Sequence, residues 1–332
     1  MNKTKSIQYN FIMNSLLMGS AYILPFLITP YVSRILLPEG MGRISFATSI
    51  MTYFTMFAML GVPTYGIRAC AKVRDNKDKL SNTVQSILCI NICMAILSYI
   101  ILLLCIHIFP KFQEERKLLY AMSIMIFLNV IGLDWLYKGL EEYKVIAVRA
   151  VIVKLIVFLL TFVLIKDKAD LILYGGITVC GLYGVGIWNF GEAKKYISFK
   201  PNNGIHIIEH IRPISIFFFM SVATVVYTNL DIVMLGFMTN DTQMGYYDAS
   251  VKIKTLLTAV VASLGTVILP RVSYYIELGK NREFENISQR ALNCIFLLAG
   301  PLVVYFTIYA KPTILLLSGK LFVNAVASMR II

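Results

Sequence analysis

The sequence predicts an all-α protein that crosses a membrane many times. Hydrophobic residues make up 58% of the 332 positions and charged residues only 15%, far from the balance of an ordinary soluble domain. The apolar residues gather in runs of about 20, the length that a helix needs to cross a hydrocarbon core of about 30 Å. Basic residues are concentrated in alternate connections between these runs. Together these observations predict a polytopic bundle of helices.

The apolar runs predict nine complete transmembrane helices and a partial tenth. Lys3 and Lys5 precede the first run, which is too long for a signal sequence and has no small-residue cleavage pattern, so we expect it to remain as a span. The last apolar run starts at Asn324 and reaches Ile332, too short a stretch to cross a bilayer as a helix. The predicted complete spans are 11–32, 44–65, 83–109, 118–137, 146–165, 171–190, 213–235, 246–269 and 292–310.

The basic residues predict the orientation of these spans. The formal net charge of +13 would suggest a nucleic-acid partner in a soluble protein. Alternating the spans from a cytoplasmic N-terminus, however, places 18 of the basic residues in cytoplasmic connections or span ends and 9 on the other side. This is the bias of a protein of the cytoplasmic membrane. We therefore expect a multi-pass protein of the bacterial inner membrane with its N-terminus inside, in contact with lipid and not with nucleic acid.

Two segments resemble each other and predict that the chain is built from two related halves. Ser33–Ala47 and Leu235–Ala249 are both short polar breaks between apolar runs, and in each a Met-Gly pair, Met41-Gly42 or Met244-Gly245, opens the following run. Halves of this kind are common in transporters, where they enclose one binding site. The polar stretch 192–212 lies after the sixth span. We expect a six-helix lobe over 1–212, including this cytoplasmic linker, and an incomplete second lobe over 213–332, as in a C-terminally truncated chain.

No motif for catalysis, nucleotide or metal binding stands out in the chain. The six cysteines form no CxxC pair and are expected to be packed free thiols. The string from His206 to His210 matches the H-x-x-E-H pattern of some zinc proteases, but it lies in the predicted linker and no third ligand accompanies it. An amphipathic surface helix is the favoured interpretation. We expect no catalytic residue, no bound metal and no cofactor.

Ionisable residues within the spans are the best candidates for function, because each costs about 3 kcal/mol at the centre of the membrane and therefore usually faces a cavity or a partner. Asp248 and Lys252 are four residues apart and should pair on one helix face, with Asp231 just across a short hairpin. Lys residues near a span end can instead extend to the interface, and Asp134 beside two aromatic residues can also lie there. The candidates are Asp134, Lys154, Asp231, Asp248, Lys252 and Lys254.

Five strings in the chain resemble one family of membrane transporters. The family is the oligosaccharide-lipid flippases of the Wzx type, polysaccharide-export members of the superfamily that also holds the MATE drug exporters and the lipid II flippases. The strings follow the family's order and cover residues 20 to about 275. They are Tyr31–Leu36 with Pro38–Gly42, Gly61–Arg68 with the basic run to Arg74, Asp134–Gly139 with Glu141–Tyr143, Asn229–Gly236, and Gly245–Ala249 with Lys252-Ile253.

The resemblance implies a MATE-like fold of two helical lobes around a central cavity that opens alternately to either side. It also implies transport of an undecaprenyl-diphosphate-linked oligosaccharide repeat unit to the outer leaflet, for O-antigen, capsule or another surface polysaccharide, in exchange for H⁺ or Na⁺. A polysaccharide polymerase and a chain-length regulator are the expected protein partners. Because a diphosphate needs cationic groups in an apolar cavity, we expect Arg34, Arg43, Lys154 and Lys252 to bind it. Asp134, Asp231 and Asp248 are the candidates for the counter-charge or coupling ion.

Two other functions remain open from the sequence. A multidrug exporter of the same fold is the first, although the string Asp134-Trp135 and the basic early connections favour the flippase. The second is a membrane-embedded polysaccharide polymerase or glycosyltransferase. Such enzymes usually need a large polar extramembrane loop, whereas the predicted external loops of this chain are all short.

Overall fold

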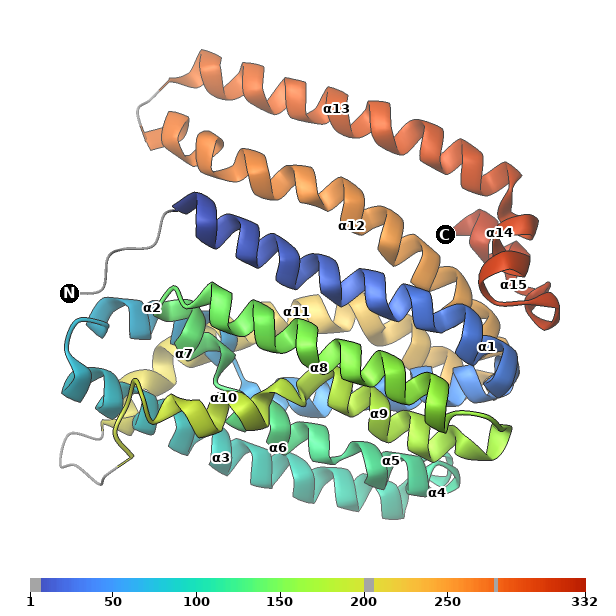
Figure 1. The fold of residues 1–332 in the computed structure, drawn as a ribbon, viewed down its shortest axis with the longest axis horizontal. Helices are drawn as coiled ribbons and strands as arrows, with labels where there is room; N and C mark the ends of the chain where they lie inside the picture. The colour runs from blue at the N-terminus through green and yellow to red at the C-terminus, as the bar shows by residue number, and fades with distance from the viewer. Residues whose placement is uncertain (1–6, 200–205, 278–279) are drawn as a thin grey trace.

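The computed structural model describes residues 7–199, 206–277 and 280–332, and it contains helices and no strand in these ranges. Seven stretches of the described residues are helical, long and apolar enough to cross a membrane. The long helices run along one common direction (Figure 1). These findings confirm the prediction of an all-α polytopic membrane protein. Part of the predicted linker and the first two lysines, at 200–205 and 1–6, lie outside the described residues.

The first two predicted spans correspond to two helical segments that are joined at a kink and together carry the label α1 (Ile7–Met59). The kink lies at Leu37, whose φ of 61° and ψ of 176° are not helical, directly before Pro38. A residue before proline is disfavoured in the helical region, and proline lacks the N–H that would continue the helix. The chain reverses there, so that α1 has a first arm (7–36) and a second arm (38–59) that returns beside it (Figure 1). The predicted polar break at 33–47 therefore contains the turn between the two arms.

The remaining predicted spans correspond to helices that are often interrupted. The fourth span is divided at Ser123 and again at Leu133, which has a positive φ of 48°, and the sixth is divided at Gly184. The eighth falls within α12, part of whose side chains lie outside the described residues, so the count of nine stays a prediction. The helices after α1 are α2 (Val62–Val73), α3 (Lys77–Ile108), α4 (Pro110–Glu114), α5 (Arg116–Met122), α6 (Ile124–Ile131), α7 (Asp134–Gly139), α8 (Tyr143–Leu164), α9 (Leu171–Tyr183), α10 (Val185–Ala193), α11 (Ile207–Met238), α12 (Asp241–Glu277), α13 (Asn281–Ile308), α14 (Ala310–Leu317) and α15 (Ala325–Ile331), with 3₁₀ turns η1 (Lys168–Asp170) and η2 (Lys320–Phe322).

Helix α1 is the centre of the bundle and contacts both predicted halves. Helices α12 and α13 lie on one side of it, and α3, α6, α8 and α10 on the other (Figure 1). Two polar side chains of α3 hold the second arm, since Asn91 Nδ2 donates to the carbonyl of Ala58 at 2.9 Å and Ser98 Oγ to that of Phe54 at 2.7 Å. Such interhelical bonds orient helices where the surrounding lipid offers no partner. Many large apolar side chains of α3 and α8 are exposed on the surface of the bundle, which is expected where helices face lipid.

Helix α11 packs along the second arm of α1 although it begins the predicted second lobe. Phe57 contacts Phe218 with ring centroids 5.6 Å apart, and Phe46 contacts Phe237 at 5.7 Å. The carbonyl of Ile214 lies so close to Gly61 that no side chain would fit there. The two predicted lobes thus share a long interface, and the division at residue 212 stays a prediction.

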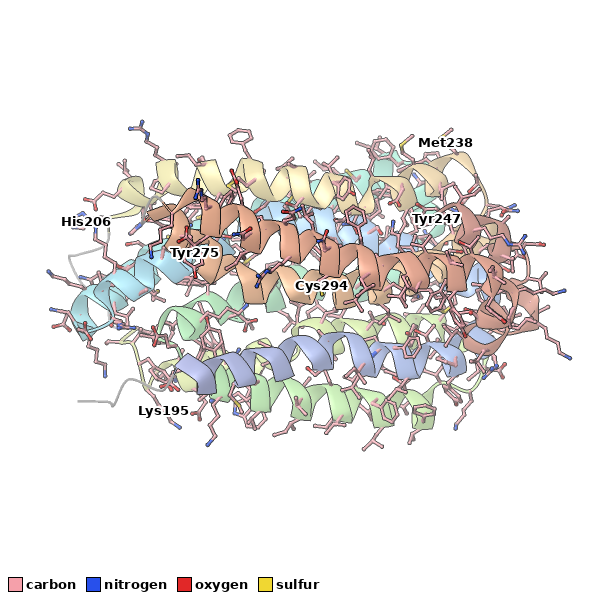
Figure 2. All side chains as sticks on the ribbon, turned by 90° about the horizontal axis from the view of Figure 1, so that it is seen from above. Lys195, His206, Met238, Tyr247, Tyr275 and Cys294 are labelled. Atoms are coloured by element: carbon pink, nitrogen blue, oxygen red, sulfur yellow. The ribbon has the colours of Figure 1, made fainter. Side chains whose placement is uncertain are left out.

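The two ends of the bundle differ, and the two repeated segments meet at one of them. We call this the kink end; it holds 37–45, 110–115, 166–170, 239–248 and 316–322, and the other end is called the opposite end. Figure 2 shows Met238 and Tyr247 towards the kink end, and Lys195 and His206 at the opposite end.

The Met-Gly pairs of the repeat touch each other at the kink end. A Cβ atom on Gly42 would overlap the carbonyl oxygen of Asp241, and one on Gly245 would overlap that of Pro38. Asp241 precedes Gly245 by four residues, just as Pro38 precedes Gly42. The contact is therefore reciprocal, as an approximate two-fold axis between the two segments requires. Only glycine permits this approach of the two backbones.

We predict that Gly245→Ala destabilises the packing of the kink end, because the added methyl group must push the Pro38 carbonyl away. Overpacking of this kind costs about 1–3 kcal/mol, so the melting temperature of the purified protein should fall. Gly176→Ala in α9 is the matched control, since no atom lies within 4 Å of the added methyl group. Equal melting temperatures for both variants would contradict the close packing described above.

Candidate functional site

A cavity with charged residues lies between the two arms of α1 and the helices of both halves. It measures about 510 Å³, within the range of ordinary ligand sites. Helices α8 and α9 form one wall, and α11 and α12 form the other. Its polar and charged lining residues are Thr29, Ser45, Thr48, Ser49, Lys154, Thr161, Tyr174, Thr178, Asn229, Asp248 and Lys252. The cavity therefore combines an apolar body with hydroxyl groups and two ammonium groups.

Lys252 of α12 forms an ion pair with Asp248, which confirms the pairing predicted from their spacing. Lys252 Nζ lies 2.6 Å from Asp248 Oδ2, and the side chains are 38% and 7% exposed. The other carboxylate oxygen, Oδ1, accepts a hydrogen bond from Ser45 Oγ at 2.7 Å. Ser45 belongs to the second arm of α1, so Asp248 connects the two halves of the molecule.

Lys154 of α8 approaches the cavity from the first half. Its ammonium group donates to Ser20 Oγ at 3.2 Å, and no ion pair of Lys154 occurs within residues 7–199, 206–277 and 280–332. The Asp134 carboxylate also attracts this ammonium group, without forming an ion pair with it. A cation whose hydrogen-bond partner is neutral can still bind an anion. With Lys252 on the facing wall, the lining residues carry two positive charges and one negative charge.

Two predicted acidic residues lie outside this cavity. Asp231 accepts a hydrogen bond from Tyr247 Oη at 2.5 Å and another from the backbone N–H of Ile232 at 2.9 Å. Tyr247 directly precedes Asp248, so Asp231 is near the cavity but is not part of its lining.

Asp134, which is exposed, contacts a network of the buried residues Asn189 and Arg149 towards the opposite end. Asn189 Nδ2 donates to Asp134 Oδ1 at 2.9 Å, and Asn189 Oδ1 accepts from Arg149 Nη1 at 3.0 Å. The Arg149 guanidinium also lies over the rings of Tyr137 and Trp188, at 5.5 and 5.6 Å from their centroids. Through these contacts, Asp134 helps to hold α7, α8 and α10 together.

The two predicted arginine ligands, Arg34 and Arg43, lie at the kink end and outside the cavity. Arg34 Nη2 donates to the carbonyl of Leu316 at 2.9 Å, which connects α1 to the end of α14. Arg43 Nε pairs with Glu115 Oε1 at 2.7 Å, and Glu115 is only 3% exposed. Both guanidinium groups are thus engaged by the protein itself.

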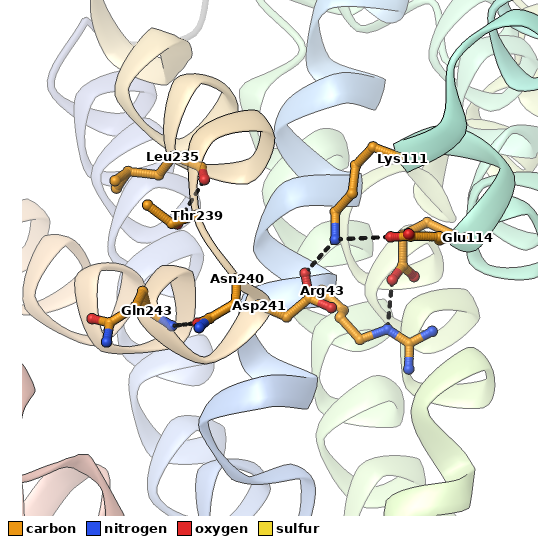
Figure 3. Close-up of polar contacts among 9 residues, drawn as sticks. Arg43, Lys111, Glu114, Leu235, Thr239, Asn240, Asp241 and Gln243 are labelled. Atoms are coloured by element: carbon orange, nitrogen blue, oxygen red, sulfur yellow. Dashed lines mark hydrogen bonds and ion pairs between the residues drawn. The ribbon is translucent and has the colours of Figure 1, made fainter.

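A third contact at the kink end joins the two halves through charged groups. Lys111 Nζ lies 2.7 Å from Asp241 Oδ1 and 3.4 Å from Glu114 Oε2 (Figure 3). Burial alone would lower the pKa of Lys111, but the hydrogen bond and charge of Asp241, together with Glu114, outweigh it and raise that pKa. The segment that presents Asp241 is fixed by Asn240 Oδ1, which accepts from the N–H of Gln243 at 2.9 Å.

Comparison with known proteins identifies the family. The family model for polysaccharide biosynthesis proteins matches residues 7–275. The chain belongs to this family. Two relatives carry the name "Putative O-antigen transporter": that of Escherichia coli (strain K12) is 25% identical over 100% of this chain and 80% of its own length, and that of Shigella dysenteriae is 25% identical over 80% and 67%. No solved structure matches the chain.

The comparisons confirm the family resemblance found in the sequence, and the chain has helices long and apolar enough to cross a membrane. Within this family member, sequence reasoning found Lys154, Asp248 and Lys252 because charges are rare in spans. It missed the contacts of Ser45, Lys111 and Asp241. Polar residues near span ends are common, and only the folded chain shows that these three cross from one half to the other.

We predict that Lys111→Met lowers the melting temperature of this family member at neutral pH, by the equivalent of about 1 kcal/mol for a partly exposed ion pair. Because the pKa of Lys111 is raised in the folded protein, its contribution is complete below the ordinary lysine pKa of 10.5 and is lost as the pH rises through the folded value. The melting difference from wild type should therefore be constant from about pH 7 to 9 and shrink above that range.

Lys117→Met is the control for this measurement, since Lys117 is exposed and has no ion pair in the described part of the chain. A pH-independent difference for Lys111→Met, or an equal loss in both variants, would show that the ion pair to Asp241 does not hold the kink end together.

Proposed function

We propose that this protein translocates an undecaprenyl-diphosphate-linked oligosaccharide across the cytoplasmic membrane for a surface polysaccharide. The observation that carries the proposal is the cavity between the halves, with Lys154 on one wall and Lys252 on the other. The family and the name of the relatives support a polysaccharide or O-antigen transporter.

The chemistry of the cavity suits each part of this substrate. In a water-poor site the two ammonium groups attract a diphosphate far more strongly than they would in bulk water. The hydroxyl groups of Tyr174, Thr178 and Ser49 offer hydrogen bonds to sugar hydroxyls. The prenyl chain can stay in the lipid, because it is as apolar as the bilayer core. A cationic drug fits less well, since the two lysines repel it.

The distribution of basic residues supports an orientation in which the kink end faces the outer side. The cavity then lies beneath an external closure formed by Gly42 with Gly245, Lys111 with Asp241, and Arg34 with Leu316. In the same scheme Asp231, with its hydroxyl partner Tyr247, is the site for a coupling H⁺ or Na⁺. A carboxylate next to the cavity, but outside its lining, can exchange a cation without competing for the diphosphate.

We predict that Lys154→Met and Lys252→Met each weaken binding of undecaprenyl diphosphate by about tenfold, the loss expected for one charge-assisted hydrogen bond. The affinity is measured by thermophoresis, with undecaprenyl diphosphate titrated into the full chain in lipid nanodiscs. Lys254→Met is the matched control, because Lys254 lies on the same helix and is exposed outside the cavity. Binding that is equally tight in all three variants would contradict the proposed site.

We also predict that Asp231→Asn leaves the affinity for undecaprenyl diphosphate unchanged but reduces surface polysaccharide in a strain that depends on this protein. The reason is that Asp231 lies outside the cavity, while the neutral amide cannot take part in cation exchange. The amount of protein in the membrane serves as the control. Normal polysaccharide in this variant, with normal protein levels, would exclude Asp231 as the coupling site.

A further inference from the structure

One carboxylate that lines the cavity binds two partners, which belong to different parts of the molecule. Asp248 is 5% exposed, its Oδ1 accepts from Ser45 of the first half at 2.7 Å, and its Oδ2 pairs with Lys252 at 2.6 Å. Ser45 and Asp248 are each the third residue after a glycine of the reciprocal contact, Gly42 or Gly245. The hydrogen bond therefore lies close to the approximate two-fold axis and one helical turn from the glycine closure.

The ion pair with Lys252 is what keeps this buried charge stable. A carboxylate removed from water is costly unless a cation or hydrogen bonds compensate it, and removing one partner of a buried pair leaves an uncompensated charge. Ser45 supplies only one neutral hydrogen bond. If Lys252 turns to another anion, Asp248 needs either a new partner or water.

Lys252 has space to leave Asp248. Its side chain is 38% exposed and lines the main cavity as well as a neighbouring one of about 170 Å³, which Leu317 and Ser318 at the end of α14 also line. An anionic group in the main cavity would thus compete directly with Asp248 for the same ammonium group.

We propose that Asp248 is the positioning residue that couples binding of the anionic substrate to opening of the kink end. When a diphosphate binds Lys252, the Asp248 carboxylate loses its counter-charge. Separation of Ser45 from Asp248 then lets water reach this carboxylate and solvate it. Opening must break the neighbouring contacts between the halves, Lys111 with Asp241 and Arg34 with Leu316. The empty protein is held closed by the same carboxylate. The inference rests on the proposed function in taking a diphosphate as the ligand.

The test measures the separation of the two halves at the kink end. Spin labels are attached to cysteines replacing Lys168 and Lys320, two exposed residues in η1 and η2, in a full chain whose six native cysteines are replaced. Distances are measured by double electron–electron resonance in nanodiscs, with and without undecaprenyl diphosphate. This readout does not depend on the orientation of the protein in the membrane.

We expect a single short distance in the unloaded protein and an additional longer distance when undecaprenyl diphosphate is present. Asp248→Asn should show only the short distance under both conditions, because no charge is left unpaired. The same variant should bind undecaprenyl diphosphate about threefold more tightly, because the Lys252 side chain, which is 38% exposed, no longer has a competing carboxylate. A purely structural role of Asp248 would instead weaken both closure and binding.

Lys252→Met provides a second, independent test, and this test needs no ligand. Its Asp248 lacks a counter-charge from the start, so the longer distance should already be present in the unloaded variant. A short distance in this variant, or a ligand-induced longer distance in Asp248→Asn, would overturn the coupling. If undecaprenyl diphosphate does not bind the wild type, the proposed substrate is wrong, and the unloaded Lys252→Met distance still decides whether Asp248 controls the kink end.

Discussion

The close approach of two backbones at Gly42 and Gly245 is the constraint on which the rest of the structure depends. It requires that neither residue has a side chain, and it requires the chain to reverse at Leu37 and again between α11 and α12 so that the two segments can face each other. This crossing brings Ser45 within hydrogen-bond distance of Asp248 and Lys111 within reach of Asp241. Both arms of α1 and the first turns of α12 also line the cavity next to this crossing.

Two sets of basic residues differ in their depth in the bundle and in their partners. Arg34, Arg43 and Lys111 lie at the end of the bundle and have backbone carbonyls or carboxylates as partners, so that each fixes one element against another. Lys154 and Lys252 lie deeper and face a cavity, where a cation is costly unless it serves a ligand or a partner. One of these lysines comes from each predicted half of the chain, and both line the same cavity.

The sequence allowed the class of fold, the family and three cavity residues to be predicted, for physical reasons that also set the limits. Length and polarity define membrane spans because the bilayer demands them, and a charge within a span is rare enough to be informative. The breaks within spans could not be predicted. Nothing in the composition near Leu133 reveals its left-handed conformation. Likewise, Arg34 and Arg43 have the right chemistry for a diphosphate, and only the fold shows that Leu316 and Glu115 engage them.

The repeat explains the scaffold but not the site. Counted from the paired glycines, Ser45 corresponds to Asp248 and Ser49 to Lys252, and all four line the same cavity. The backbone positions are thus shared, yet only the second half carries charge at them. The first half supplies its cation from a different element, Lys154 of α8. An exact two-fold site would set equal charges against each other across the axis, at a cost in electrostatic repulsion. The unequal pairs instead allow a serine to bind an aspartate across the axis, while one lysine from each half lines the cavity.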